Sequence, residues 1–264
     1  MIFDTHTHYD DARFEGEREE IIASLKKAGI GGLVAVGADL ESSRRSVALA
    51  ERYPFIRAAV GVHPHDIEEA EALGEEGFRA ELEALANHSA VRAVGEIGLD
   101  YHWEEPDRLL QQKWFRFQLD FLREKKLPGV IHSRDAAADT LGLIRDAGGQ
   151  ALSLDIHCFS YEKEMARLYL DMGHYLGIGG VVTYKNGRKL KEVVQYMPLE
   201  RILLETDCPY LAPEPYRGKR NDSRLLPFVV REIARLKNTD EEEVEAVCLE
   251  NALRFFRLCK EDFV

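Results

Sequence analysis

Short β-rich runs alternate with amphipathic, charged segments along the whole sequence, and this alternation limits the possible folds more than any other feature. Eight runs are predicted to be strands, namely 2–8, 30–37, 55–62, 91–98, 128–132, 151–157, 174–180 and 201–207. The segments between them predict helices over 15–28, 41–51, 67–87, 107–126, 134–147, 161–172 and 187–196. Two further helices are predicted near 224–237 and 240–257. The pattern indicates an α/β protein with a (β/α)8 TIM barrel and one or two extra C-terminal helices.

A doubly wound open sheet is the competing architecture for such an alternation. Its dinucleotide-binding form is excluded because no Gly-x-Gly-x-x-Gly follows the first run. No stretch resembles a linker, so the 264 residues predict a single domain over 1–264. The barrel is therefore the expected fold.

Charge and composition narrow the class of partner. The formal net charge is −12, whereas a protein that grips long duplex DNA along a groove is usually basic. Any polyanionic substrate should therefore be held locally, by metal ions or by a small basic cluster. No apolar run is long enough to span a membrane, and no leader precedes the first strand, so we expect a cytoplasmic protein without membrane association. Nothing indicates an obligate protein partner.

The histidines gather where strands end. His6 and His8 are two apart on the first predicted strand, so their side chains should point the same way. Seven of the nine histidines lie at or just after strand ends: His6, His8, His63, His65, His102, His132 and His157. In a parallel barrel the active site lies at the carboxyl ends of the strands. This distribution predicts a metal site there.

Six residues form the predicted ligand set: His6, His8, Glu96, His132, His157 and Asp207. Four imidazoles with two carboxylates suit Zn²⁺ or Mn²⁺, whereas Mg²⁺ alone prefers more oxygen ligands. Six ligands exceed one tetrahedral zinc but fit two ions that share a bridging carboxylate, for which Glu96 is the candidate. Two such ions would polarise a phosphoryl or carbonyl group and activate water. Asp207 is the candidate general base.

Residues next to the ligands have weaker assignments. Cys158 and Cys208 each follow a proposed ligand, and the period of two directs both thiols away from the barrel axis into packing. Asp4, Asp155 and Glu205 lie two residues before ligands. They either orient the ligands or fill polar layers of the barrel.

Substrate contacts are predicted on the loops. Arg217, Lys219 and Arg220 follow the last strand and could hold a phosphate, although a solvated basic turn would look the same. Arg134 is a second candidate for binding an anion. His65 and Tyr101 lie where a substrate could stack or form hydrogen bonds.

Taken together, these residues resemble the TatD family of metal-dependent deoxyribonucleases, within the amidohydrolase-type barrels. The resemblance spans nearly the whole chain. Its motifs are His6-Thr7-His8, GVHPH at 61–65, GEIGLDY at 95–101, IHSRDA at 131–136, HCFS at 157–160, ETDCPYLAP at 205–213 and RGKRN at 217–221. Two positions depart from the family pattern: Tyr161, where the family usually has Gly, and Asp222-Ser223 in place of Glu-Pro.

The resemblance implies a hydrolase with two divalent cations. The first would be held by His6, His8, Glu96 and Asp207, and the second by Glu96, His132 and His157. It also implies Mg²⁺- or Mn²⁺-supported hydrolysis of DNA ends or single strands, often as a 3′–5′ exonuclease. The alternatives are a two-metal hydrolase of another ester or amide bond (a small molecule, a lactone or an aminoacyl-tRNA) and a non-catalytic, metal-stabilised binding protein.

Overall fold

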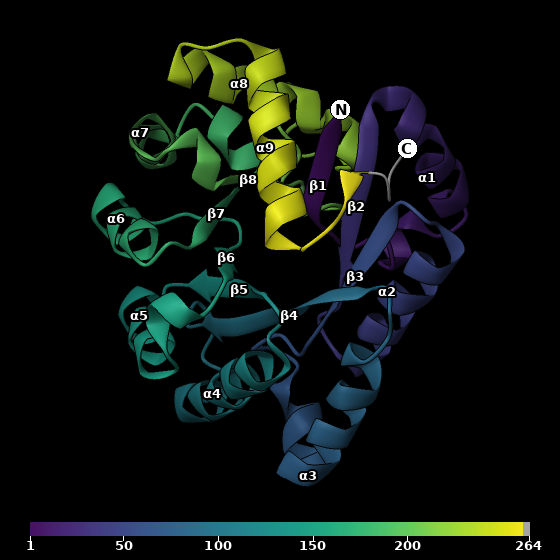
Figure 1. Ribbon diagram of the computed structural model, residues 1–264, viewed down its shortest axis with the longest axis vertical. Helices are drawn as coiled ribbons and strands as arrows, with labels where there is room; N and C mark the ends of the chain where they lie inside the picture. Colours follow the sequence, from purple (N-terminus) through teal and green to yellow (C-terminus); the bar gives the residue numbers. More distant parts are fainter. Residues whose placement is uncertain (261–264) are drawn as a thin grey trace.

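Eight parallel strands form a single sheet that follows the order of the sequence from β1 to β8 (Figure 1). The computed structural model describes residues 1–260. The strands are β1 (Ile2–Thr7), β2 (Ile30–Val36), β3 (Ile56–Val60), β4 (Val91–Asp100), β5 (Gly129–Arg134), β6 (Leu154–Ile156), β7 (Tyr175–Ile178) and β8 (Ile202–Leu204). A bridge between Thr7 and Cys208 brings the last segment back to β1. The sheet is therefore a nearly closed barrel, and the predicted TIM barrel is confirmed.

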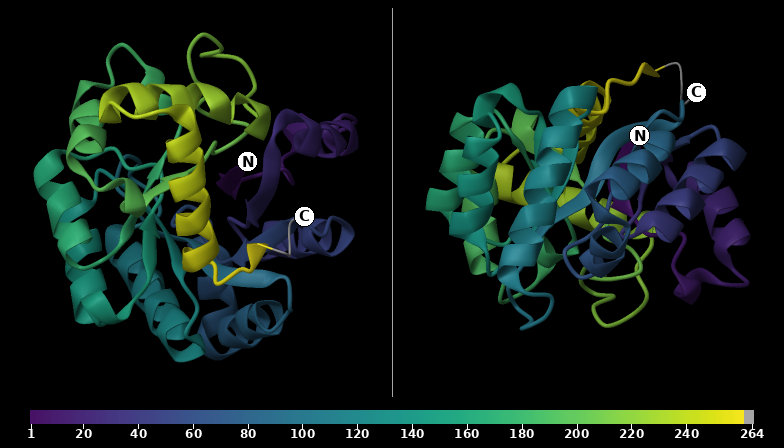
Figure 2. Two further views of the ribbon diagram at one scale, coloured as in Figure 1. Left: turned by 45° about the horizontal axis from the view of Figure 1, so that its top comes forward. Right: turned by 90° about the horizontal axis from the view of Figure 1, so that it is seen from below.

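Helices alternate with the strands and surround the barrel (Figures 1 and 2). They are α1 (Arg18–Leu25), α2 (Leu40–Arg52), α3 (Ile67–Ala86), α4 (Arg108–Lys125), α5 (Ala137–Asp146), α6 (Lys163–Asp171), α7 (Arg188–Tyr196), α8 (Leu226–Lys237) and α9 (Glu241–Phe255). Aspartates begin several of them: Asp39, Asp107 and Asp240 each accept backbone N–H groups from the first turn of the helix that follows. Within residues 1–260 no helix combines the length and apolar character that crossing a membrane requires.

The last helix, α9, packs across the amino-terminal end of the barrel. The amide of Asn251 donates to the carbonyl oxygens of Leu199 and Ile202, both at 2.9 Å, just where β8 begins. The Phe256 ring stacks near Phe3 at the start of β1, with the ring centroids 6.2 Å apart. Figure 1 shows α9 (yellow) crossing this end of the sheet. A substrate must therefore approach from the carboxyl ends of the strands.

The strand ends differ from the predicted ones where the candidate ligands lie. The strand β6 ends at Ile156 and β8 ends at Leu204, so His157 and Asp207 lie just beyond regular structure. In contrast, β4 continues to Asp100, two residues further than predicted. Hydrophobic pattern alone cannot locate these ends, because polar residues lie both within the strands, as Asp100 does in β4, and just beyond them, as His157 does after β6.

Gly98 allows β4 and β5 to approach each other closely. Its φ is +151°, and a Cβ atom there would lie 1.9 Å from the carbonyl oxygen of His132. We expect Gly98→Ala to lower the free energy of unfolding by about 3 kcal/mol or more, through backbone strain and the displaced strand. Urea unfolding of metal-free protein measures this effect. Gly142→Ala in α5 is the control, since it has nothing within 4 Å and should be neutral or stabilising by up to about 1 kcal/mol. Equal stabilities for the two variants would contradict the prediction.

Candidate metal centre

The first group of converging side chains lies where β1 meets the segment after β8. His6 and His8 leave the end of β1 with their Nε2 atoms 3.0 Å apart. Glu96 Oε2 lies 3.5 Å from the Nε2 atom of His6 and 3.8 Å from that of His8. Asp207 Oδ1 is 3.9 Å and 3.5 Å from the same two nitrogens. Four side chains therefore face one small space.

The second group faces the other oxygen of Glu96. Glu96 Oε1 lies 2.8 Å from His132 Nδ1 and 3.6 Å from His157 Nε2. His63 Nε2 is 3.9 Å from the same oxygen. The two oxygens of this single buried carboxylate therefore face two different pairs of predicted histidine ligands, which is the arrangement that a bridging carboxylate requires.

The distances between the donor atoms and the tautomer of His8 both suit the binding of a divalent cation. Nitrogen and oxygen ligands about 2.0–2.2 Å from a tetrahedral ion lie about 3.4 Å apart, close to the 3.0–3.9 Å between the donors around His6 and His8. His8 Nδ1 lies 2.9 Å from the carbonyl oxygen of Val36, which can only accept a hydrogen bond. The Nδ1 atom therefore carries the proton, and the lone pair of neutral His8 is on Nε2, which faces the cluster. The residues present can therefore hold a metal.

Without a metal, protons on the imidazoles balance the carboxylates. Burial opposes a charge on His8, but Asp207 and Glu96 outweigh it and raise the pKa of His8 to about 9. Burial likewise opposes a charge on His157, whose pKa Glu205 and Glu96 raise to about 10. Burial would raise the pKa of Glu96, yet the surrounding imidazoles hold it well below its usual value. A metal ion would therefore displace protons from the cluster.

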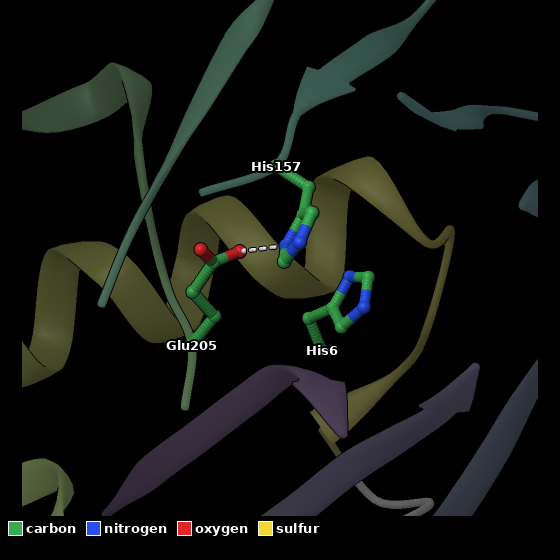
Figure 3. A group of neighbouring side chains, drawn as sticks. All are labelled: His6, His157 and Glu205. Atoms are coloured by element: carbon green, nitrogen blue, oxygen red, sulfur yellow. Dashed lines mark hydrogen bonds and ion pairs between the residues drawn. The ribbon is translucent and has the colours of Figure 1, made fainter. Parts of the chain in front are cut away.

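Two carboxylates contact the ring nitrogens of His157 and His132 that face away from Glu96. Glu205, fully buried, accepts a hydrogen bond from His157 Nδ1 at 3.1 Å (Figure 3). It accepts another from the backbone N–H of Cys158 at 2.7 Å. Asp100 lies 3.2 Å from His132 Nε2, on the side of the ring opposite Glu96. Such contacts fix which nitrogen of each imidazole is free to ligate. For Glu205, the structure favours the orienting role over simple filling of a polar layer.

We expect Glu205→Gln to weaken metal binding by about 10- to 100-fold, because glutamine has one acceptor oxygen where two contacts need one each. Titration of the metal-depleted protein with Mn²⁺ or Zn²⁺ against a competing chelator measures this loss. Glu200→Gln is a matched control, since Glu200 is exposed before the start of β8. Unchanged affinity in Glu205→Gln would show that the His157 ring is oriented without this carboxylate.

Asp4 and Asp155 have different surroundings. Asp4 accepts hydrogen bonds from the backbone N–H and the hydroxyl of Thr206, at 3.0 and 2.7 Å, and from the hydroxyl of Ser223 at 2.7 Å. It therefore holds the segment that carries Asp207, and Ser223, one of the departures from the family pattern, is part of this support. Both carboxylate oxygens of Asp155 are buried, with no hydrogen-bond partner among residues 1–260.

The predicted direction of Cys158 is wrong. Its backbone has φ of +46°, in the left-handed region, just after β6 has ended, so the strand alternation no longer applies. The thiol lies within 4.8 Å of ligand atoms of His157 and Asp207. Burial and the neighbouring carboxylates raise its pKa well above the usual value, which keeps it neutral. Cys208, in contrast, packs in the hydrophobic core as expected.

Two residues of the site are not among the six predicted ligands: His63, which counted only as one of the histidines at strand ends, and Asp100. Together with His132 they place three potential ligand atoms within 4.8 Å of one another. Asp100 could have been found from spacing, because Glu96 and Asp100 are four apart and a strand directs both to the same face. The predicted strand ended at residue 98, and so the alternation was not followed to Asp100.

A cavity of about 1040 Å³ lies over this cluster. Of the residues predicted to contact substrate, His65 and Arg134 line it. Within residues 1–260 its lining does not include Tyr101, Arg217, Lys219 or Arg220. Tyr101 donates its hydroxyl hydrogen to Asp139 at 2.8 Å, and Arg220 is bound to Glu17 at 2.7 Å. Arg217 lies over the Tyr184 ring, 4.2 Å from its centroid, and Lys219 is exposed on the same outer loop.

The other departure from the family pattern supports the loop after β5. The Tyr161 hydroxyl lies 2.9 Å from the hydroxyl of Ser133 and accepts the backbone N–H of Ala136 at 3.2 Å. These two contacts flank Arg134 in the sequence. Tyr161 thus holds the backbone that presents Arg134 to the cavity.

A parallel barrel with imidazoles and carboxylates converging at the carboxyl ends of its strands defines a metal-dependent hydrolase. The family model described as TatD related DNase matches residues 3–257, and the chain belongs to the TatD family. It is 41% identical over 258 residues to the uncharacterized metal-dependent hydrolase YabD of Bacillus subtilis, covering 98% of this chain and 100% of that one. It is 34% identical to a protein of Cronobacter sakazakii named 3′-5′ ssDNA/RNA exonuclease TatD, with 97% of each chain covered. The crystal structure of YJJV, a TatD homologue of Escherichia coli K12, superposes with a TM-score of 0.90 at 29% identity, covering 98% of each chain.

Proposed function

We propose that this hydrolase cleaves phosphodiester bonds of DNA, at strand ends or in single strands, as a 3′–5′ exonuclease. The observation that carries the proposal is Glu96, whose two oxygens face two separate histidine pairs at the base of a large cavity. Paired cations suit an in-line displacement at phosphorus, because they can stabilise the attacking and leaving oxygens together. The exonuclease name of the Cronobacter relative supports the same substrate class.

The proposed ligand sets follow the two faces of Glu96. His6, His8, Glu96 and Asp207 would hold one divalent cation, and Glu96, His132 and His157 the other. When bound, Mg²⁺, Mn²⁺ or Zn²⁺ would polarise the phosphoryl group and lower the pKa of water. Glu205 and Asp100 keep the rings of His157 and His132 in place. Asp207, whose side chain retains 17% exposure, accepts the proton of the attacking water.

Basic side chains around the site would contact the substrate both near the reacting phosphate and further from it. Arg134 lines the cavity itself and is placed to contact a phosphate close to the cluster. Arg217 and Lys219, exposed on the loop after β8, would guide a strand towards the cavity from outside. In the right-hand view of Figure 2 this loop (light green) projects away from the end of the molecule at which the C-terminus lies.

A small ester or amide is the second candidate substrate. Five carboxylate side chains line the part of the cavity that follows β1 and β2: Asp10, Asp11, Glu15, Asp39 and Glu41. A neutral substrate avoids the repulsion that these groups exert on a polyanion. An assay that resolves products, run with metal-loaded enzyme on end-labelled single-stranded DNA, RNA and small esters, separates the candidates. Stepwise loss of nucleotides from the 3′ end is expected; turnover of esters without cleavage of DNA would overturn the proposal. Metal binding without turnover of any of these substrates would favour a binding protein.

Asp207→Asn should reduce kcat on single-stranded DNA by about 10³-fold, since asparagine can still offer an oxygen ligand but cannot accept the proton of water. The metal content of the purified variant, measured in parallel, separates this effect from loss of the ion. Activity within about tenfold of the parent enzyme, at full metal content, would show that another group is the base.

A further inference from the structure

The wall of the cavity formed by the loops after β4 and β5 presents two side chains that the fold itself does not use. Trp103 follows β4 and is 55% exposed, although large apolar rings are normally buried. Its ring meets the edge of His102 with the centroids 4.9 Å apart. Arg134 ends β5, and within residues 1–260 its guanidinium makes no hydrogen bond or ion pair. Both residues line the cavity over the metal centre.

The two loops are held together as one unit. The backbone N–H of Tyr101 donates to the carbonyl oxygen of Arg134 at 2.9 Å. One residue further along each loop, His102 Nδ1 lies 3.1 Å from a carboxylate oxygen of Asp135. The backbone segments that carry Trp103 and Arg134 therefore keep a fixed relation to each other, which helps to preform a binding site.

Among the described residues, the opposite wall offers a polyanion no unpaired arginine. Its two arginines already have partners: Arg18 donates to the backbone carbonyls of Tyr9, Asp10 and Asp11, and Arg45 is paired with Asp10 and Glu41. This wall follows β1 and β2, and the strand order places β1 across the barrel from β5. Among the arginines that line the cavity, only Arg134 thus remains to meet a phosphate.

A second hollow adjoins the cavity beyond Trp103 and His65. The carboxylates of Glu68, Glu104 and Glu105 line it together with these two side chains. A strand continuing past Trp103 would bring its phosphates against three exposed carboxylates. Repulsion by these carboxylates disfavours a strand that continues past Trp103 and so favours stacking by the base of the last nucleotide.

We propose that Trp103 and Arg134 form a subsite for the terminal nucleotide of a single strand, with the base stacked on the indole and a phosphate on the guanidinium. This inference rests on the proposed phosphodiester hydrolysis and adds the feature that makes the enzyme act at ends. Stacking on an aromatic ring favours single strands without selecting a base, because every base has a π face. Arginine matches a phosphate through two parallel N–H donors.

The test uses metal-loaded enzyme and an end-labelled oligothymidylate. Trp103→Ala should raise KM about tenfold, which corresponds to about 1.4 kcal/mol, and leave kcat within about twofold. Trp103→Phe should recover most of the affinity. For an oligonucleotide that lacks only its terminal base, KM of the parent enzyme should already be about tenfold higher, and Trp103→Ala should add nothing. Tyr196→Ala, which removes an exposed aromatic ring on α7 that does not line the cavity, should change neither constant.

Fluorescence gives a readout of binding without catalysis. The chain has two tryptophans, and Trp114 is fully buried, so a ligand in the cavity should quench Trp103 alone. In EDTA, saturating oligothymidylate should quench the emission, and the oligonucleotide without its terminal base should quench it much less. Hydrolysis of DNA with KM independent of both Trp103 and the terminal base would overturn the subsite and leave the proposed function standing. Failure to hydrolyse DNA with any of the three metals would overturn both.

Discussion

Glu96→Gln should reduce turnover of single-stranded DNA on the order of 10⁴-fold, the largest effect expected of any single substitution in this chain. The amide leaves one oxygen where both oxygens of Glu96 face histidines, so one ion loses its ligand and the two ions lose their bridge. A factor of 10⁴ corresponds to about 5.5 kcal/mol of transition-state stabilisation, within the several kcal/mol that bound cations supply.

The measurement is kcat for end-labelled DNA at saturating Mn²⁺, together with the metal content of the purified variant. We expect that content to fall towards one ion per chain. Glu51→Gln is the matched control, because Glu51 is exposed, away from the cluster, and paired with His88 at 3.0 Å. A variant that retained two ions and more than a tenth of the activity would show that Glu96 does not bridge.

Removing the metal should abolish activity and lower the melting temperature, with both restored by Mg²⁺, Mn²⁺ or Zn²⁺. An ion that binds the folded protein but not the unfolded chain stabilises the fold by about 2.7 kcal/mol when its free concentration is a hundred times its Kd. The chelated protein should nevertheless stay folded, because the barrel has an apolar core of its own and protonated imidazoles balance the buried carboxylates. Calorimetry of chelated and reloaded protein measures the shift.

The same cluster sets the pH dependence of metal binding. His8 and His157 hold protons in the metal-free protein, with pKa values of about 9 and about 10, and an ion must displace them. Affinity should therefore rise as pH increases from about 6 to 9, by up to about tenfold per pH unit for each proton released. Constant affinity across that range would show that the ligands are already neutral before the metal binds.

The barrel and the convergence of most of the candidate metal ligands could be predicted from local patterns. Alternating runs specify strands and helices because each element must bury one face, and this pattern repeats eight times. His6 and His8 could be placed together because a strand directs residues two apart to one side. The other candidate ligands were placed with them by the rule that parallel strands in a barrel end at the same face.

Local patterns failed where the chain leaves regular structure. Cys158 turned towards the cluster because its backbone is left-handed, and strand periodicity carries no information about such a residue. The three basic residues predicted to hold a phosphate do not act together in the structure. Arg220 is paired with Glu17, whereas Arg217 and Lys219 lie on the outer loop. No sequence pattern singles out Trp103, because its role depends on the cavity that it lines in the folded barrel.

By itself, the sequence determined the class of fold, the face that carries the chemistry and the six side chains that meet there. The tertiary structure alone decided how these side chains meet: each oxygen of Glu96 faces its own histidine pair, and Glu205 supports His157 from 48 residues away. The physical reason is that periodicity reports the direction of a side chain relative to its own strand. Distances between strands, and the backbone beyond their ends, depend on how the whole barrel closes.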